Sequence, residues 1–407
     1  LINDKTNLRF RVKSGRCIFI VAAKRTAFGT YGGTLKNHTA TDLAVIASKA
    51  ALEAGNIKPE LIDHVIFGNV VQSCQDAPYL ARHVGLRVGV PEKIPALTLN
   101  RLCGSGFQAV VSAAQDIITK DALVVLTGGT ESMSEVPFVV RNVRFGTRLG
   151  GNYKFEDILW DCLTDSYVNT PMALTAEKLG AMYNVTRKDA DAFALRSQTL
   201  WKKAQDSGAF KEEMAPVTVK KKNKEVVFDV DEHPRPSTAE TLAKLPPVFK
   251  KDGLVTAGNA SGVCDGAGAV VVAGEEAVKT HNLKPLARIV GWHIVGVDPS
   301  IMGIGPAPAI RGLLQKTKLK LDDIDLIEVN EAFAPQCAAV QRELKIPDEK
   351  LNVSGGAIAL GHPLAASGAR ISAHLVHEMR RRKVKYGIGS ACIGGGQGIA
   401  VLFEVAH

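Results

Sequence analysis

Short apolar runs alternate along the chain with longer segments in which apolar residues recur at helical spacing. The β-branched run from Cys17 to Ala23 predicts a strand, whereas the residues from Ala40 to Ala54 have helical periodicity and end at Gly55. Further strands are predicted over 63–71, 97–102 and 122–127, with a helix that runs through residue 118. The last of these strands is expected to stop at Gly128-Gly129. This alternation is typical of an α/β fold, in which helices cover parallel or mixed sheets.

The same order of elements recurs near the C-terminus. DHVIFGNVVQ from Asp63 resembles DLIEVNEAFAPQ from Asp325, an offset of 325 − 63 = 262 residues. The pairs Gly106/Gly368 and Thr127/Gly389 have the same offset of 262 (368 − 106 and 389 − 127). A constant offset predicts two similar halves. An accidental match of short common patterns is the alternative.

The region between the two halves differs in character. Residues 128–247 contain a long polar helical segment, Arg187 to Ser207, and the proline-rich stretch HPRPS around Pro234. We expect an inserted loop domain that covers one face as a lid or cofactor-binding region. The predicted division is 1–16 as an extension, 17–127 plus about 248–280 as the first half, 128–247 as the insertion and 281–407 as the second half.

Composition excludes several classes of protein. With 407 residues, 46% of them hydrophobic, the chain can bury a large core in two or three domains. No apolar run approaches the roughly 20 residues of a membrane span, so no stable membrane insertion is expected. The 7 cysteines are scattered without the spacing of a zinc site, which predicts no metal and suits a reducing compartment.

The formal charge of +9 is spread along the chain. Two basic runs, Lys220 to Lys224 and Arg380 to Lys383, are read first as a solvated turn and a helix end, and otherwise as an attraction for a polyphosphate ligand. Aromatic residues are sparse and do not interleave with these runs, so nucleic-acid binding is not expected. Residues 1–16 are basic and resemble a mitochondrial presequence or its remnant, with a disordered tail as the alternative. Since the first residue is Leu1, we expect that it is not the native start.

Cys103, in RLCGSGFQAVV, is the first candidate for chemistry. It lies between a predicted strand and the start of a helix, where the helix dipole and free backbone N–H groups favour a thiolate and an oxyanion. This pattern predicts a nucleophile; a small buried residue at a tight turn is the alternative. His362 lies in the glycine-rich GGAIALGHPLAASGARI, and Cys392 lies in SACIGGGQG at the end of an apolar strand. Each alone would be structural, but three reactive groups at equivalent strand ends predict a catalytic site.

Five segments carry a resemblance to a known family. They are NRLCGSGFQ, GNASGVCDGAGA, VNEAFAPQ, GGAIALGHPLAASG and SACIGGGQG, which resemble the signature blocks of the thiolase family in family order. The similarity runs from about Cys17 to the C-terminus. It implies the thiolase fold: two βαβαβαββ halves packed as a five-layer α-β-α-β-α sandwich with an inserted loop domain. Stretches such as VAAKRTAFG and LPPVFKKDG are most similar to the mitochondrial branch of the family, which acts on 3-ketoacyl-CoA.

The resemblance implies roles for matching positions. Cys103 would carry the acyl group as a thioester, and His362 would accept its proton. Cys392 would protonate the departing acetyl-CoA carbanion, and Asn330 would hold a water that stabilises the enolate oxygen together with His362. A second oxyanion hole would come from the N–H groups of Cys103 and Gly394. One departure is Ala365, where family members commonly have glycine.

The resemblance also implies coenzyme A as a co-substrate, with no covalently bound cofactor. Arg235 and Thr238 would lie near the adenine and phosphate end of CoA, and Ser261 near the pantetheine. The implied partners are CoA and 3-ketoacyl-CoA, the implied assembly is a homotetramer built as a dimer of dimers, and the implied location is the mitochondrial matrix.

Three other functions are alternatives to this one. A ketoacyl synthase acting on acyl carrier protein is disfavoured, because such sites use histidine or asparagine where this chain has Cys392. A non-catalytic lipid-binding protein of the same fold is disfavoured by the four reactive positions together. Within the thiolases, a degradative enzyme in fatty acid β-oxidation is favoured over a biosynthetic one confined to acetoacetyl-CoA.

Overall fold

The computed structural model describes residues 17–222 and 224–406. The presequence predicted for residues 1–16 lies outside the described residues. The strands are β1 (Ile18–Thr26), β2 (Gly29–Thr30), β3 (His64–Gly68), β4 (Ala96–Leu99), β5 (Val124–Ser132), β6 (Phe138–Val140), β7 (Phe155–Asp157), β8 (Thr164–Asp165), β9 (Thr170–Pro171), β10 (Met214–Ala215), β11 (Val217–Lys221), β12 (Lys224–Phe228), β13 (Cys264–Gly274), β14 (Ala287–Gly296), β15 (Leu326–Val329), β16 (Tyr386–Ile393) and β17 (Gln397–Val405). The helices are α1 (Ala40–Ala54), α2 (Leu80–Arg87), α3 (Ser105–Thr119), α4 (Ile158–Cys162), α5 (Met172–Met182), α6 (Arg187–Asp206), α7 (Ala239–Ala243), α8 (Glu275–Thr280), α9 (Pro306–Thr317), α10 (Ala334–Leu344), α11 (Ala357–Leu360) and α12 (Ala366–Arg382).

Local sequence signals explain where the predicted elements begin and end. Helix α1 has the bounds expected from its periodicity, because Thr39 and Asp42 form a capping box at its start and Gly55 follows its last residue. The strand expected to stop at Gly128-Gly129 instead continues to Ser132. That expectation was wrong because these glycines allow close approach rather than a turn. A Cβ on Gly129 would lie 1.9 Å from the backbone oxygen of Ala365.

The two halves repeat each other in register as well as in sequence. Strands β3 and β5 pair in parallel with His64 opposite Val125, and strands β15 and β16 pair in parallel with Leu326 opposite Gly387. Both members of the pair are shifted by 262 residues (326 − 64 and 387 − 125). The predicted internal repeat is therefore confirmed. In the second half, the strand equivalent to β4 is reduced to a single bridge between Ile327 and Leu351.

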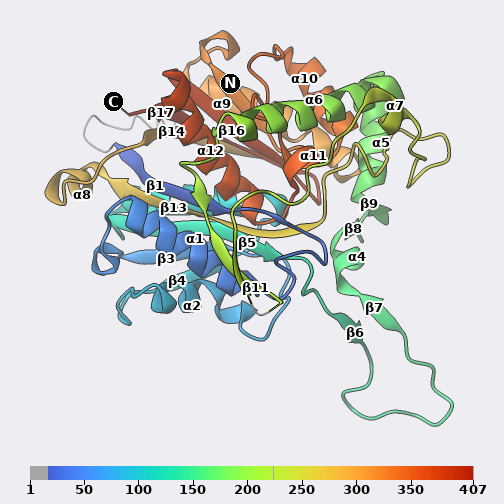
Figure 1. The fold of residues 1–407 in the computed structure, drawn as a ribbon, viewed down its shortest axis with the longest axis horizontal. Helices are drawn as coiled ribbons and strands as arrows, with labels where there is room; N and C mark the ends of the chain where they lie inside the picture. The colour runs from blue at the N-terminus through green and yellow to red at the C-terminus, as the bar shows by residue number, and fades with distance from the viewer. Residues whose placement is uncertain (1–16, 223, 407) are drawn as a thin grey trace, which may run out of the picture.

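The elements stack in the five layers that were expected (Figure 1). Helices α3 and α12 form the central layer between the β4-β3-β5-β13-β1 sheet and the β14-β17-β16-β15 sheet. Helices α1 and α2 cover the outer face of the first sheet, and α9 and α10 cover that of the second. The two sheets also join along β1 and β14, where Phe19 pairs with Arg288 and Ile20 with Ala287.

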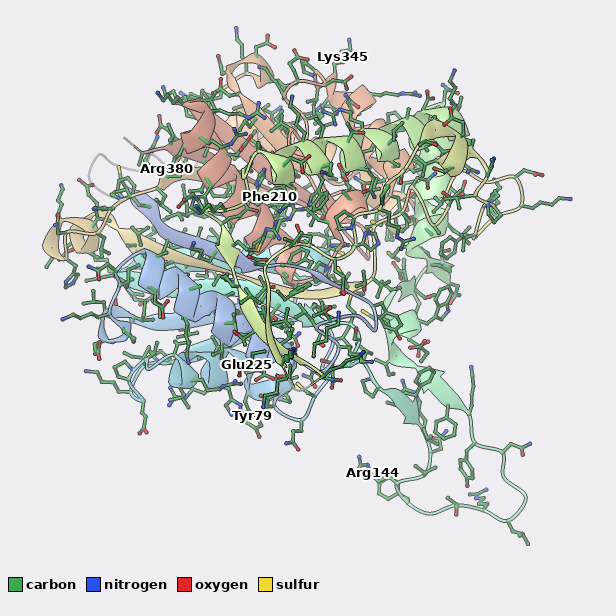
Figure 2. All side chains as sticks on the ribbon, viewed as in Figure 1. Tyr79, Arg144, Phe210, Glu225, Lys345 and Arg380 are labelled. Carbon is green, nitrogen blue, oxygen red and sulfur yellow. The ribbon has the colours of Figure 1, made fainter. Side chains whose placement is uncertain are left out.

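Within the expected insertion, β10 pairs in parallel with β1, whereas one arm projects from the body (Figure 1). Strands β6 and β7 form the base of this arm, and Figure 2 shows Arg144 on its outer part. Helices α5 and α6 pack instead on α10, beside the second half. Within residues 17–222 and 224–406, no helix is long and apolar enough to cross a membrane.

Candidate active site

Cys103 lies in a short 3-10 turn, Leu102–Gly104, between β4 and α3. Leu102 has a φ of 47°, in the left-handed region that a leucine rarely adopts. Its N–H donates to Asn100 Oδ1 at 2.8 Å, and its carbonyl accepts from the hydroxyl of Ser105 at 2.7 Å. These local bonds hold the strained turn and therefore fix the position of Cys103.

The turn lies against the end of β16, which carries Cys392. A Cβ on Gly104 would come within 2.5 Å of the Ile393 side chain, so only glycine allows this approach. Cys392 is buried at the end of β16, and the backbone N–H groups of Gly394 and of Cys103 itself lower the pKa of the Cys103 thiol. The two cysteines from different halves therefore meet with two N–H donors beside them.

His362 is buried two residues after the short helix α11, behind Gly361 with its φ of 103°. The backbone N–H of His362 donates to Gly262 O at 2.9 Å. The ring nitrogen Nδ1 lies within hydrogen-bond distance of Ser367 Oγ. The Ser367 hydroxyl also reaches Pro363 O at 3.2 Å. If the hydroxyl donates to that carbonyl, Nδ1 must donate to Oγ, which leaves Nε2 as the basic nitrogen.

Asn330 follows β15 and lies beside the imidazole. Its backbone N–H donates to Ser390 O at 2.9 Å, which ties it to the strand that carries Cys392. The amide nitrogen lies 3.4 Å from Nδ1 and 3.3 Å from Nε2 of His362, so it sits beside the ring rather than in line with either nitrogen. Its Oδ1 is buried and has no hydrogen-bond partner among the described residues. A buried acceptor of this kind is a site for a water or a substrate group.

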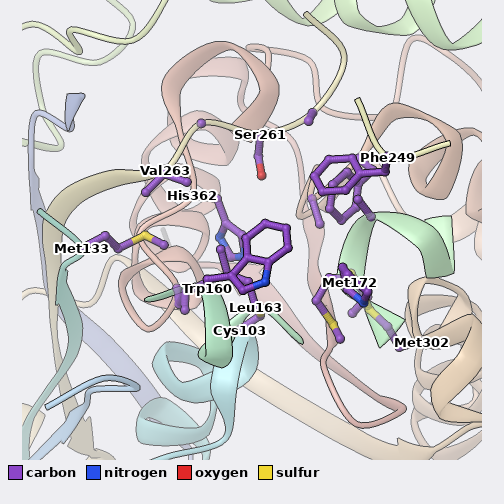
Figure 3. Close-up of a pocket in the computed structure, with 18 residues that line it drawn as sticks. Cys103, Met133, Trp160, Leu163, Met172, Phe249, Ser261, Val263, Met302 and His362 are labelled. Carbon is purple, nitrogen blue, oxygen red and sulfur yellow. The ribbon is translucent and has the colours of Figure 1, made fainter. Parts of the chain in front are cut away.

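One cavity brings the reactive groups together (Figure 3). Its lining includes Cys103, His362, Cys392 and Ser261. Asn330 is not part of the lining, but its amide nitrogen lies 3.3 Å from His362 Nε2. The rest of the lining is mostly apolar and comes from Met133, Trp160, Leu163, Pro171, Met172, Ala173, Phe249, Ala260, Gly262, Val263, Met302, Ala332, Phe333 and Leu364. Trp160 and Phe249 stack with ring centroids 6.4 Å apart. The cavity therefore offers two thiols and an imidazole to an apolar ligand.

The titration of these groups departs from one expectation. Burial raises the pKa of the Cys103 thiol to about 11, and the Glu131 carboxylate also raises it, whereas the two backbone N–H groups lower it. The expected preference for a thiolate is therefore wrong for the resting site, because burial outweighs the backbone donors. Burial, followed by the charge of Arg370, lowers the pKa of His362 to about 3. The resting pair is thus a thiol beside a neutral imidazole.

Cys392 is also protonated at rest. Burial, followed by the proximity of Cys103, raises its pKa well above the usual value of a thiol. Two neighbouring thiols that both hold their protons can act in different steps, one as a nucleophile after deprotonation and one as an acid.

The residues expected near CoA divide between two places. Ser261 lines the cavity with the reactive groups, whereas Arg235 and Thr238 are exposed and do not. Arg235 lines a separate surface pocket with His233 and Gly258, and Thr238 caps the start of α7. The backbone from residue 257 to residue 262 passes from this pocket to the cavity.

Two further residues contact the reactive groups or the turn that carries them, and the sequence patterns above did not identify either. Ser367 was used only to align the repeat, although its place five residues after His362 at the start of a predicted helix was an available signal. Glu131 hydrogen-bonds to the turn that follows His362, and no local pattern marked it. Among the described residues, no group of three or more His, Cys, Asp or Glu side chains is arranged to hold a metal ion.

Comparison with known families agrees with this geometry. Models of the "Thiolase, N-terminal domain" and the "Thiolase, C-terminal domain" match residues 18–276 and 283–405. The chain belongs to the thiolase family. This thiolase is 64% identical over 390 residues to the Homo sapiens protein named "3-ketoacyl-CoA thiolase, mitochondrial", covering 96% of the chain and 98% of the relative. It is 63% identical to the Bos taurus protein of that name, with the same coverage of 96% and 98%.

Solved structures are similar over the same length. The crystal structure of human mitochondrial 3-ketoacyl-CoA thiolase matches this thiolase with a TM-score of 0.95 and 63% identity, covering 96% of the chain and 99% of the human one. The thiolase fold expected from the sequence is therefore confirmed. A second human structure is a complex with CoA and matches with a TM-score of 0.94, 63% identity and coverage of 96% and 98%.

Proposed function

We propose that this chain is a 3-ketoacyl-CoA thiolase, an acyltransferase that moves an acyl group through a cysteine thioester to CoA and releases acetyl-CoA in fatty acid β-oxidation. The observation that carries the proposal is the meeting of Cys103, His362 and Cys392 at one apolar cavity, with Asn330 beside the imidazole. The relatives named 3-ketoacyl-CoA thiolase support it.

In the first half-reaction, Cys103 Sγ attacks the 3-keto carbonyl while His362 Nε2 accepts the thiol proton. The bond between the second and third acyl carbons then breaks, and its electron pair passes to the leaving acetyl-CoA as an enolate. The Cys392 thiol gives its proton to the second carbon. Its raised pKa suits this role, because the thiol keeps its proton until a much stronger base forms.

Two oxygens gain charge in this step. The oxygen of the attacked carbonyl would accept from the N–H groups of Cys103 and Gly394, the two backbone donors that lower the pKa of the Cys103 thiol. The enolate oxygen would be stabilised by protonated His362 and by a water held at Asn330. The unpartnered Oδ1 of Asn330 supports such a water, because this oxygen can accept a hydrogen bond from the water.

In the second half-reaction, CoA replaces acetyl-CoA. The Cys392 thiolate takes the proton of the CoA thiol, the CoA sulfur attacks the acyl-Cys103 thioester, and the Cys103 thiolate regains its proton from His362. For this reaction CoA would extend from Ser261 in the cavity to Arg235 and Thr238 at the surface, along the backbone of residues 257–262. The human structure in complex with CoA supports CoA as the co-substrate.

The wider setting is inferred from the relatives. Their names place them in mitochondria, and we propose the mitochondrial matrix for this chain. A homotetramer built as a dimer of dimers is proposed from the family, and sedimentation as a stable monomer would contradict it. We also keep the division into two halves, 17–127 with 248–280 and 281–407, around an inserted 128–247 region, as a proposal.

A biosynthetic thiolase confined to acetoacetyl-CoA is the second candidate. A relative named "Acetyl-CoA acetyltransferase" from Syntrophomonas wolfei is 48% identical over 394 residues, covering 96% of this chain and 99% of that protein. The human and bovine relatives at 64% and 63% identity favour the degradative enzyme.

The test is thiolysis of 3-ketoacyl-CoAs of increasing chain length, from acetoacetyl-CoA upward. Wild type, Cys103→Ser and the control Cys17→Ser would be compared, since Cys17 lies just before β1 and outside the cavity. Cleavage of long chains by wild type and the control, but not by Cys103→Ser, is the expected result. Cleavage of acetoacetyl-CoA alone would select the biosynthetic enzyme, and no cleavage at all would favour a non-catalytic role.

A further inference from the structure

A buried carboxylate that the mechanism does not use lies near Cys103 in the fold, because it accepts from the Val70 N–H, and Val70 and Cys103 pack against the same apolar cluster. Glu131 is the penultimate residue of β5, and its side chain is fully buried. Its hydrogen-bond donors among the described residues are neutral amides, so no cation neutralises it there. Burial of a carboxylate without a counter-ion costs desolvation free energy. We therefore expect a function of Glu131 in its hydrogen bonds.

Its hydrogen bonds join the two halves of the chain. Oε1 accepts from Asn69 Nδ2 at 3.0 Å and from the Val71 N–H at 2.9 Å, both in the loop after β3. The Val70 N–H lies 3.2 Å from each carboxylate oxygen. Oε2 accepts from the Ala365 N–H at 3.0 Å, in the turn that carries His362. One side chain of β5 therefore holds the turn of the second half that carries His362.

The point of attachment matters because Ala365 lies between His362 and Ser367. The His362 N–H is fixed separately by Gly262, and Glu331 accepts from the Ile358 N–H at 3.1 Å on the upstream side. The bond from Ala365 to Glu131 is thus the tie on the downstream side. It holds the residue just before α12, and Ser367 lies in the first turn of that helix.

We propose that Glu131 is a positioning residue of the active site, which fixes the turn between His362 and Ser367 and whose negative charge acts through space on Cys103. The part of this proposal that concerns turnover rests on the proposed thiolase reaction. The part that concerns the Cys103 thiol does not, because thiol reactivity can be measured without any substrate.

The groups that face this charge are few. Glu131 raises the pKa of both Cys103 and Cys162, while Cys392 and His362 are the other titratable groups that line the cavity with Cys103. Burial raises the pKa of Glu131 itself to about 7. The carboxylate therefore gains its charge near neutral pH, and above that pH it opposes formation of the Cys103 thiolate.

Two substitutions of Glu131 separate the effect of its charge from the effect of its side-chain length. Glu131→Gln keeps the size of the side chain and removes the charge, whereas Glu131→Asp keeps the charge and shortens the reach toward Ala365. The readouts are alkylation of Cys103 by iodoacetamide against pH, followed by mass spectrometry of the peptide that contains Cys103, and the kcat of thiolysis. Glu378→Gln is the matched control, because Glu378 is also a buried carboxylate but binds Arg381 and Arg382, away from the cavity.

We expect Glu131→Gln to move the pH midpoint of alkylation down by about half a unit to one unit. Glu131→Asp should leave this midpoint near that of wild type but lower kcat by about 10- to 100-fold through misplacement of the turn. The control should match wild type in both. An unchanged midpoint in Glu131→Gln would refute the action on Cys103, and an unchanged kcat in Glu131→Asp would refute the positioning. If wild type cleaves no 3-ketoacyl-CoA while the midpoint still moves, the proposed function fails and the effect of Glu131 on Cys103 stands.

Discussion

Nδ1 of His362 lies within hydrogen-bond distance of Ser367 Oγ, five residues further along the chain at the start of α12. This contact fixes the imidazole relative to a helix that packs against both sheets. It also ties the basic nitrogen, Nε2, to the side of the ring opposite the serine. The orientation of the His362 imidazole is therefore set by helix α12 as well as by the glycine-rich turn.

Replacement of Ser367 by alanine should leave the fold intact and impair the base. Nδ1 would lose its partner, so the ring could rotate and exchange tautomers, and kcat/KM for thiolysis should fall by about 10- to 100-fold. Steady-state kinetics and thermal unfolding measure the two effects. Ser372→Ala is the control, since that hydroxyl is buried in the same helix but donates to Gly368 O and not to the imidazole. Equal losses of activity in both variants would contradict the specific role of Ser367.

Loss of the base should make activity strongly dependent on pH. In His362→Ala no imidazole would accept the Cys103 proton, and the raised pKa of about 11 would leave only a small thiolate fraction near pH 8. Because that fraction grows about tenfold per pH unit below the pKa, thiolysis by the variant should rise steeply from pH 7 to pH 10. Wild type should change much less over this range. Parallel pH-rate profiles would decide the matter, and a flat profile for the variant would show that Cys103 ionises without His362.

The sequence predicted the architecture well because the relevant signals are local and repeated. Asp63 and Asp325 illustrate this point. The Asp63 carboxylate accepts from the Leu123 and Val124 N–H groups, and the Asp325 carboxylate accepts in the same way from Lys385 and Tyr386. One acidic residue before β3 and one before β15 thus bind the start of the neighbouring strand, and the two lie 262 residues apart (325 − 63). A repeated short pattern carries such a role faithfully.

Contacts between distant segments were harder to predict. Gly129 was read as a turn signal because its close neighbour, the Ala365 carbonyl, lies far along the chain. Glu131 was missed for the same reason, since its partner is the Ala365 N–H. The pKa of Cys103 was misjudged because the local helix start was visible in the sequence and the depth of burial was not. Chemistry-bearing residues could be found from local motifs, but their electrostatic setting required the assembled halves.

A methyl group at position 129 should disrupt the site from a distance. In Gly129→Ala the new Cβ would meet the Ala365 carbonyl oxygen at 1.9 Å, a contact with backbone that cannot move aside easily. The turn after His362 must then shift, and we expect a loss of about 2–4 kcal/mol in stability together with most of the thiolysis activity. Gly296→Ala is the control, because a Cβ there would lie 3.9 Å from the backbone oxygen of Gly396, an ordinary van der Waals contact. Wild-type activity in Gly129→Ala would mean that the turn tolerates displacement.

One buried carboxylate should stabilise the fold most strongly in the middle of the pH range. Glu213 bonds to the guanidinium of Arg25 at 2.6 Å and to Nδ1 of His374 at 2.7 Å, and it joins the residues before β10 to β1 and α12. The pKa of Glu213 is lowered to about 2 despite burial, because of His374 and then Arg25. The pKa of His374 is raised despite burial, chiefly by Glu213.

These shifts have opposite consequences. A carboxyl with a depressed folded-state pKa contributes stability above its unfolded value of 4.5, and this is lost as pH falls toward about 2. A histidine with a raised pKa contributes stability that is complete below its unfolded value of 6.5 and is lost as pH rises through the folded value. Glu213→Gln should remove both contributions and lower the free energy of unfolding by about 3 kcal/mol near pH 6.

Chemical denaturation of wild type and Glu213→Gln between pH 3 and pH 9 would measure this difference. It should be largest between the two unfolded values and shrink toward either end of the range, because each wild-type contribution is lost there. Asp206→Asn removes an ion pair with Lys202 whose side chains are 66% and 59% exposed, and it should cost no more than about 0.5 kcal/mol. A difference between wild type and Glu213→Gln that does not vary with pH would mean that Glu213 contributes packing and hydrogen bonds rather than charge.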